Sequence, residues 1–313
     1  MRIIYLGTSD IAVPALKALI DSAQEVAAVV TQPDKISGRG KSIRFSPVKE
    51  AALAAALPIL QPEQIKEESV RNELAKLSPD LFVVTAYSQT SPDEVIHIAP
   101  YGCINIHPSL LPKYRGAAPL IGAILNGEEK TGVTIMRIAA ELDAGNILAQ
   151  QELPIEPDDT LRTLEPKAAE LGAKMLLEVI TQMEQGTLTE TEQDPAAATY
   201  MRTISKEAGK INFSQPAKQI RCQIRAFDPW PSAYTSLDGK TFKFWAADVV
   251  ENTEDAEPGT VVYVDKKTLV VKCGTDALSL REVQMEGKKR MTIEEFLRGK
   301  KVETGFRFGE SFS

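Results

Sequence analysis

The sequence predicts an α/β protein of two domains: a mainly parallel sheet covered by helices, followed by a small β-barrel. In the first half of the chain, apolar runs typical of buried strands alternate with helical patterns. After one long amphipathic helix and a polar segment, the chain changes to short strands separated by turns. With 313 residues, 43% of them hydrophobic and 25% charged, the chain can bury a sizeable core, and two domains are the better expectation.

The first domain is expected to consist of apolar strands joined by helices. Ser9 or Asp10 can cap a helix that carries Leu16 and Leu19 at helical spacing. Because the strands are apolar throughout, we expect helices on both faces of the sheet and ligands beyond the carboxyl ends of its strands. The expected strands cover residues 2–6, 25–30, 58–60, 80–85, 102–107 and 134–138, with a further helix at 47–56.

The second half begins with a long helical pattern over residues 158–186, for which Gly186 is a plausible end. Residues 187–203 are polar with a run of three alanines, which is typical of a linker between domains. Asp238 and Gly239 then form a clear hairpin signal, and short strands at this spacing suggest a β-barrel of about 100 residues. We therefore expect domains at 1–189 and 206–313, joined by a linker at 190–205.

Several classes of protein are excluded or disfavoured by composition. The chain has no stretch of about 18 consecutive apolar residues, so a transmembrane helix is not expected. Its first residues lack the basic and small-residue features of a signal peptide. Cys103, Cys222 and Cys273 are odd in number and show no CxxC spacing, which argues against a disulfide framework and a zinc site. We expect a cytoplasmic protein without a metal.

Charge is unevenly distributed along the chain. The net charge is −7, yet residues 206–313 carry 18 basic and 16 acidic residues. Within the acidic first part, residues 35–49 contain five basic residues and no acid. Such a patch can direct a polyanion to one face of an acidic protein, although a solvated loop is the simpler interpretation of this segment alone.

Polar side chains that could support catalysis meet at the predicted end of one strand. The chain has two histidines, and His97 lies in an apolar-periodic stretch typical of a packed or surface helix. Asn105 and His107 are two residues apart and therefore point to the same side of their strand. They form either a polar site or a turn-forming pair, and Asp143, in a turn containing Gly145, is by itself most simply a turn residue.

Several longer segments resemble the methionyl-tRNA formyltransferases, and the resemblance covers residues 2–307. In the first half they are RIIYLGTSDIAVPAL, VVTQPDKISGRGKSIRFSPVK, GCINIHPSLLPKYRGAAPL and ELDAGNIL. In the second half they are ATYMRTISKE, IRAFDPWPSAY and GKKRMTIEEFL. The pattern HxSLLPxxxG alone marks the wider folate-dependent formyltransferases, while the basic loop and the C-terminal segments indicate the tRNA enzymes. The resemblance implies a Rossmann-like first domain and an OB-like barrel.

The resemblance also implies a reaction and its residues. A formyl group would pass from 10-formyltetrahydrofolate to the α-amine of initiator methionyl-tRNA. Separately, we expect a monomer, because nothing in the sequence pattern demands a partner surface. Asn105 would donate to the oxyanion, and His107 would donate to the same oxygen or carry the proton. Asp143 would orient the imidazole and raise its pKa. The implied folate contacts are Ser109, Leu110, Leu111, Pro112, Ala86 and Tyr87, and the implied tRNA contacts are Arg39, Lys41, Arg44, Lys288, Lys289 and Arg290.

One departure from the family pattern lies on the expected folate-facing rim, where Ser88 and Thr90 replace a glycine and an apolar residue. The main alternative function is formyl transfer to a nucleotide-linked amino sugar, since that family shares the HxSLLPKYRG and DAG features. A non-catalytic RNA-binding protein is disfavoured by the complete trio of Asn105, His107 and Asp143. A dehydrogenase is disfavoured because Gly7-Thr8-Ser9-Asp10 is not a dinucleotide fingerprint.

Overall fold

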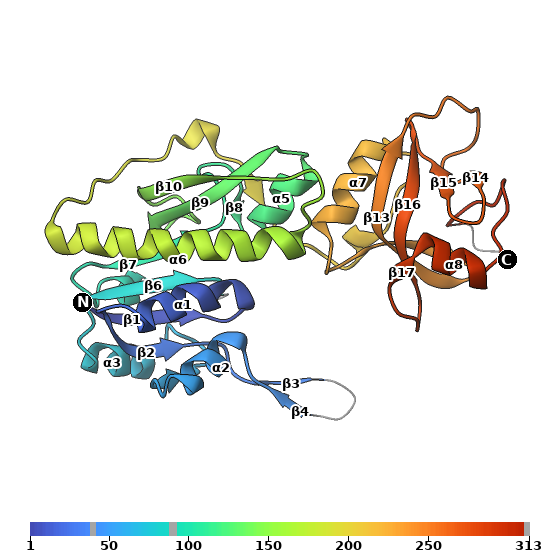
Figure 1. The fold of residues 1–313 in the computed structure, drawn as a ribbon. Coiled ribbons are helices and arrows are strands. Elements are labelled where there is room, and N and C mark those ends of the chain that lie inside the picture. The colour runs from blue at the N-terminus through green and yellow to red at the C-terminus, as the bar shows by residue number, and fades with distance from the viewer. Residues whose placement is uncertain (38–41, 88–92, 310–313) are drawn as a thin grey trace. The chain divides into compact units, whose positions relative to one another are not determined.

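The computed structural model describes residues 1–37, 42–87 and 93–309, and the chain forms two compact units (Figure 1). Each unit contains its own sheet. The domain limits expected from the sequence remain a prediction. The first unit consists of Met1–Pro119, Lys130–Pro154 and Glu165–Met201, and the second of Leu120–Glu129, Ile155–Leu164 and Arg202–Ser313.

A seven-stranded sheet forms the centre of the first unit, in the order β10-β9-β7-β6-β1-β2-β5. The strands from β5 to β7 are parallel, whereas β9 pairs antiparallel with both β7 and β10. The prediction of a mainly parallel sheet is therefore confirmed. The strands are β1 (Arg2–Gly7), β2 (Glu25–Val30), β5 (Ile59–Leu60), β6 (Leu81–Thr85), β7 (Cys103–His107), β9 (Lys130–Arg137) and β10 (Ile147–Pro154).

Helices cover this sheet because each carries an apolar face. The long helix α6 approaches β7 closely: a Cβ added to Gly172 would lie 2.7 Å from Cγ2 of Ile106. The first helical turn is a 3₁₀ segment at Asp10–Ala12 (η1), and Ser9 precedes it without making a side-chain cap. The α-helices of the first unit are α1 (Val13–Ile20), α2 (Pro47–Ala54), α3 (Glu68–Lys76), α4 (Asp93–Ile96) and most of α6 (Leu161–Gln185), whereas α5 (Pro119–Leu125) belongs to the second unit from Leu120 onward.

Two short strand pairs complete the first unit. β3 (Lys35–Ser37) and β4 (Ser42–Arg44) form an antiparallel pair within the basic segment. β8 (Arg115–Gly116) pairs in parallel with β11 (Tyr200–Met201), which follows the 3₁₀ segment η2 (Pro195–Ala197). The chain after α6 thus returns to the segment that follows β7.

The second unit is built on an antiparallel sheet in the order β12-β13-β16-β15-β14, with β17 paired to β16. The predicted hairpin turn is present, with Asp238 and Gly239 at φ 51° and 71°. Aromatic rings fill the core, where Phe242 packs against Phe244 and Phe308. The elements are η3 (Glu207–Gly209), α7 (Ala217–Ala226), β12 (Ala233–Leu237), β13 (Lys240–Val250), β14 (Val261–Val264), β15 (Leu269–Lys272), β16 (Ala277–Met285), β17 (Met291–Thr292) and α8 (Ile293–Gly299).

Within the described part of the chain, none of the helices combines the length and the apolar character that crossing a bilayer requires.

Candidate active site

The carboxyl end of β7 presents Asn105 and His107 on one side of the first sheet. β7 lies between β6, to which it is parallel, and β9, to which it is antiparallel. Asn105 is half-buried and stands in register with Met136 of β9, and His107 is buried in register with Thr134. The strand register therefore fixes both side chains in the way that their two-residue spacing predicts.

Both ring nitrogens of His107 face protein groups. Nε2 lies 3.0 Å from the carbonyl oxygen of Tyr114, and Nδ1 lies 3.7 Å from Oδ2 of Asp143. A carbonyl can only accept, so Nε2 carries the proton of the neutral ring and Nδ1 is left as the basic nitrogen. Burial lowers the pKa of His107 below 6.5, although the Asp143 charge and the bond to Tyr114 partly oppose this shift. The imidazole is therefore neutral near pH 7.

Asp143 is held in place by backbone geometry as well as by its carboxylate contacts. The residue has a φ of 51°, in the left-handed region that few side chains adopt. Its Oδ2 accepts a hydrogen bond of 2.7 Å from the backbone N–H of Gly116. The same oxygen faces His107, so Asp143 is more than a turn residue: its carboxylate is directed at the ring.

The segment of Ser109, Leu110, Leu111 and Pro112 is held to β9 by a buried threonine. The Thr134 hydroxyl donates to the carbonyl of Ser109 at 2.6 Å and accepts from the N–H of Leu111 at 3.2 Å. Gln150 on β10 donates to both the Thr134 hydroxyl and the carbonyl of Leu111, each at 2.9 Å. Leu110 lies directly against Gly132, where no Cβ could be accommodated. The loop is thereby fixed beside His107.

Sequence reasoning did not identify Thr134 and Gln150 as site residues. The available signal was weak: Thr134 is a polar residue within the buried stretch of β9 at residues 133–136, where its neighbours are apolar. Its partners come from the loop after β7 and from β10. Such long-range pairing cannot be read from local spacing.

The rim after β6 contains two of the expected folate contacts. Ala86 is exposed and has a φ of 48°, while Tyr87 is buried. Among the described residues, no group forms a hydrogen bond with the Tyr87 hydroxyl, and burial raises its pKa to about 12. A buried phenol that stays protonated can donate a hydrogen bond to a ligand. Ser88 and Thr90 lie outside the described residues.

The expected tRNA contacts are spread over both units. Arg39 and Lys41 lie outside the described residues, and Arg44 is exposed at the end of β4. Lys288 and Lys289 are exposed in the turn between β16 and β17. Their charges are therefore available to an anionic partner of the second unit.

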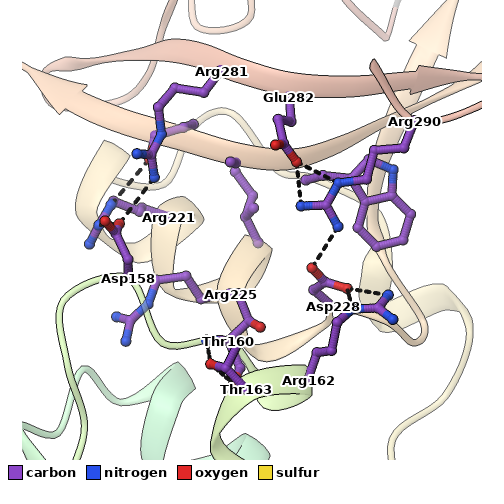
Figure 2. A pocket seen from close by; sticks show the side chains of 14 residues that line it. Asp158, Thr160, Arg162, Thr163, Arg221, Arg225, Asp228, Arg281, Glu282 and Arg290 are labelled. Carbon is purple, nitrogen blue, oxygen red and sulfur yellow. Dashed lines mark hydrogen bonds and ion pairs between the residues drawn. The ribbon is translucent and has the colours of Figure 1, made fainter. Parts of the chain in front are cut away.

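Arg290 lines a cavity of about 370 Å³ in the second unit, which Figure 2 shows from close by. Its guanidinium contacts the buried carboxylate of Asp228 at 2.9 Å and also pairs with Glu282. On the opposite side, Asp158 pairs with Arg221 and Arg281 at 2.9 and 3.0 Å. Acids thus neutralise much of the guanidinium charge, and we assign these contacts primarily to holding the second unit together. The remaining lining residues are Thr160, Arg162, Thr163, Ile224, Arg225, Trp245, Ala246 and Ala247.

Comparison with known proteins identifies the family. Residues 1–180 match the formyl transferase family, and residues 203–301 match its C-terminal domain. A methionyl-tRNA formyltransferase of Agathobacter rectalis is 46% identical over 308 residues, covering 98% of this chain and 99% of the relative. One of Bacillus licheniformis is 46% identical over 309 residues, covering 98% of each. The chain belongs to the methionyl-tRNA formyltransferase family.

Membership in this family confirms the prediction of a formyl-transferring enzyme and favours the tRNA reaction over transfer to an amino sugar. Solved structures add evidence on the fold alone. A methionyl-tRNA formyltransferase from Clostridium thermocellum superimposes with a TM-score of 0.56 at 16% identity, covering 91% of this chain and 98% of the other. WlaRD, a sugar 3N-formyltransferase solved with dTDP and 5-N-formyltetrahydrofolate, gives 0.66 at 22% identity over 92% and 99%.

Proposed function

We propose that this chain moves the formyl group of 10-formyltetrahydrofolate onto the α-amine of initiator methionyl-tRNA, and that Asn105, His107 and Asp143 surround the reacting carbon. The observation that supports this site most directly is the 3.7 Å approach of the His107 ring to Asp143 at the carboxyl end of a central strand. In sheets of this type, ligands bind at that edge. We propose a monomer as the active form.

The residues at this edge suit a folate cosubstrate. The Tyr87 hydroxyl is a buried donor without a partner among the described residues, and the loop from Ser109 to Pro112 is held rigid by Thr134. A pterin ring carries several hydrogen-bonding groups on a flat surface. A protonated phenol and a fixed, partly apolar loop can hold such a surface.

The reaction requires no protein nucleophile. The amine nitrogen bonds to the formyl carbon, the bond from that carbon to the folate N10 breaks, and one proton moves from the amine to N10. Cys103 lies on the same strand face as Asn105, but burial raises the pKa of its thiol, which keeps it protonated. The α-amine, with a reference pKa near 8, is partly neutral at cellular pH.

We assign a different part of this transfer to each side chain. The Asn105 amide can donate to the oxyanion, an interaction whose removal raises the barrier by roughly 2.7–4 kcal/mol. His107, neutral and with Nδ1 basic, can accept the proton of the attacking amine and return it to N10. The Asp143 carboxylate would then face the imidazolium and stabilise it.

The substrate is tested by supplying the purified protein with 10-formyltetrahydrofolate and either charged initiator tRNA or a nucleotide amino sugar. We expect formylmethionyl-tRNA to form, and formylation of the sugar alone would contradict the proposal.

The site is tested by Asn105→Ala, for which we expect at least a roughly hundredfold loss of kcat with unchanged folding. Asn72→Ala, at an exposed position of α3, is the matched control. A normal single-turnover rate in Asn105→Ala would remove Asn105 from the reacting centre.

A further inference from the structure

The segment after α6 returns to the candidate active site instead of leading directly into the second unit. The segment belongs to the first unit as far as Met201. Its strand β11 pairs with β8, where Met201 lies opposite Gly116, and the N–H of Gly116 donates to the Asp143 carboxylate. Gln193 and Tyr200 of this segment both contact Arg115. A stretch with the composition of a linker thus supplies side chains to the surroundings of Asp143.

The carboxamide of Gln193 is buried and uses its full hydrogen-bonding capacity. Its oxygen accepts from Nε and Nη2 of Arg115 at 3.1 and 2.9 Å. Its nitrogen donates to the carbonyls of Asp143 and Gly145 at 2.8 and 2.7 Å. The inverted amide would place N–H groups against a guanidinium and an oxygen against two carbonyls, so only one orientation satisfies the site.

Arg115 fixes Gln193 from the other side. Its side chain is 2% exposed, and a buried guanidinium is stable only where partners compensate for the loss of water. Among the described residues, the carboxylate that pairs with it is that of Glu141, which is 69% exposed and lies 3.2 Å away, while Nη1 also donates to the Tyr200 hydroxyl. The bonds to the Gln193 oxygen are therefore the fully buried part of this arrangement.

These contacts act on the turn that carries the candidate catalytic carboxylate. The backbone of Asp143 is in the left-handed region, and Gln193 binds its carbonyl and that of Gly145 two residues later. Gly116, the neighbour of Arg115 in β8, binds the Asp143 carboxylate itself. The carboxylate is thus held by β8, and the turn is held by Gln193 in the segment that leads to β11.

We propose that Arg115 and Gln193 are a positioning pair that sets the Asp143 carboxylate against His107 during formyl transfer. The inference rests on the proposed function of Asp143 and His107 and extends it to two residues that contact the turn of Asp143 or one another. Arg115 orients the Gln193 amide, Gln193 holds the backbone of the turn, and the turn presents Oδ2 to the imidazole. Their role is exerted through Asp143.

The variant that separates positioning from simple packing is Gln193→Glu. The glutamate keeps an acceptor for Arg115 but places an oxygen against the carbonyls of Asp143 and Gly145. We expect kcat to fall by at least about tenfold, because a displacement of about 1 Å in a catalytic group can reduce the rate by about 100-fold. Tyr200→Phe is the control, since it removes a hydroxyl contact to Arg115 and leaves the Gln193 bonds intact. We expect kcat in that control to stay within about twofold of the unmodified enzyme.

A second readout distinguishes this role from a structural one. In the Asp143→Asn background, adding Gln193→Glu should cause no further loss of kcat, because both changes act on the same carboxylate. NMR titration of His107 should also show a changed pKa in Gln193→Glu, since the Asp143 carboxylate moves relative to the ring and a second carboxylate is introduced beside it. Full activity and an unchanged titration in Gln193→Glu, or independent losses in the double variant, would overturn the proposal.

The titration needs no substrate, so it tests the inference even if methionyl-tRNA is not formylated. Should Gln193→Glu not fold, Arg115→Lys provides the same test. A single ammonium cannot reproduce the paired donation from Nε and Nη2. We therefore expect kcat to fall, and the pKa of His107 to fall because the Asp143 charge moves away without a new charge being added. Unchanged values in that variant would count against the positioning pair.

Discussion

The protonation of His107 depends on two opposing effects at the scale of single atoms. The sequence led us to expect that Asp143 would raise the pKa of His107, and the structure contains that interaction. Burial of the ring is the larger effect, and the pKa therefore falls below 6.5. No sequence pattern could reveal this balance, since it depends on how completely the loop after β7 covers the imidazole.

We predict that NMR titration will give His107 a pKa below 6.5 and that Asp143→Asn will lower it further. The variant removes the charge that favours the protonated ring. His97→Gln leaves a single histidine, so its background isolates the signal. A pKa above 6.5, or a rise in Asp143→Asn, would contradict the assignment.

The lowered pKa of His107 also determines how the free energy of unfolding changes with pH. The unfolded chain binds a proton at His107 below about pH 6.5, and the folded chain binds it only at lower pH. This residue should therefore reduce the free energy of unfolding as the pH falls from 7 through 6.5. The reduction should level off below the folded pKa.

At the scale of elements, strands were predictable where one segment is apolar throughout. The run at 25–30 became β2, and the helix ending at Gly186 became α6. β10 was not expected because its exposed polar positions conceal the strand, and the pair of β8 and β11 is too short to show a period. Partners chosen across long sequence separations, such as Thr134 with Leu111, also remained hidden.

We predict that Thr134→Val will lower the free energy of unfolding by about 1–3 kcal/mol, because it leaves buried groups of the loop without a partner. KM for the folate cosubstrate should rise as the loop loses its anchor to β9. Thr131→Val is a matched control in the same strand, since the Thr131 hydroxyl is buried without a hydrogen-bond partner among the described residues. Chemical denaturation and steady-state kinetics measure both effects. Equal stability losses in the two variants would contradict the role of Thr134.

Over the whole molecule, charge is divided between the parts of the chain. The first 205 residues carry a net charge of −9 and the remainder +2, so an acidic protein can still present basic groups to a polyanion. The two-domain α/β class followed from apolar alternation and the hairpin signal. The sequence pattern did not predict that residues 120–129 and 155–164 belong to the second unit, because that assignment arises from contacts between segments far apart in the chain.

We predict that Lys288→Ala and Lys289→Ala will each raise KM for charged tRNA. Each should also reduce the slope of log KM against log salt by about 1 where the lysine meets a phosphate. Lys266→Ala makes the same charge change at an exposed position of the same unit. Parallel effects in all three variants would indicate a general effect of net charge instead of a local contact.

The return of the chain to β8 has a practical consequence for anyone who shortens or grafts this protein. A fragment that stops at residue 189 would retain Asn105, His107 and Asp143 but would lack Gln193 and Tyr200. Arg115 would then be left in the interior without its amide acceptor. A fragment of the first unit that keeps the contacts around Asp143 should therefore extend at least to Met201.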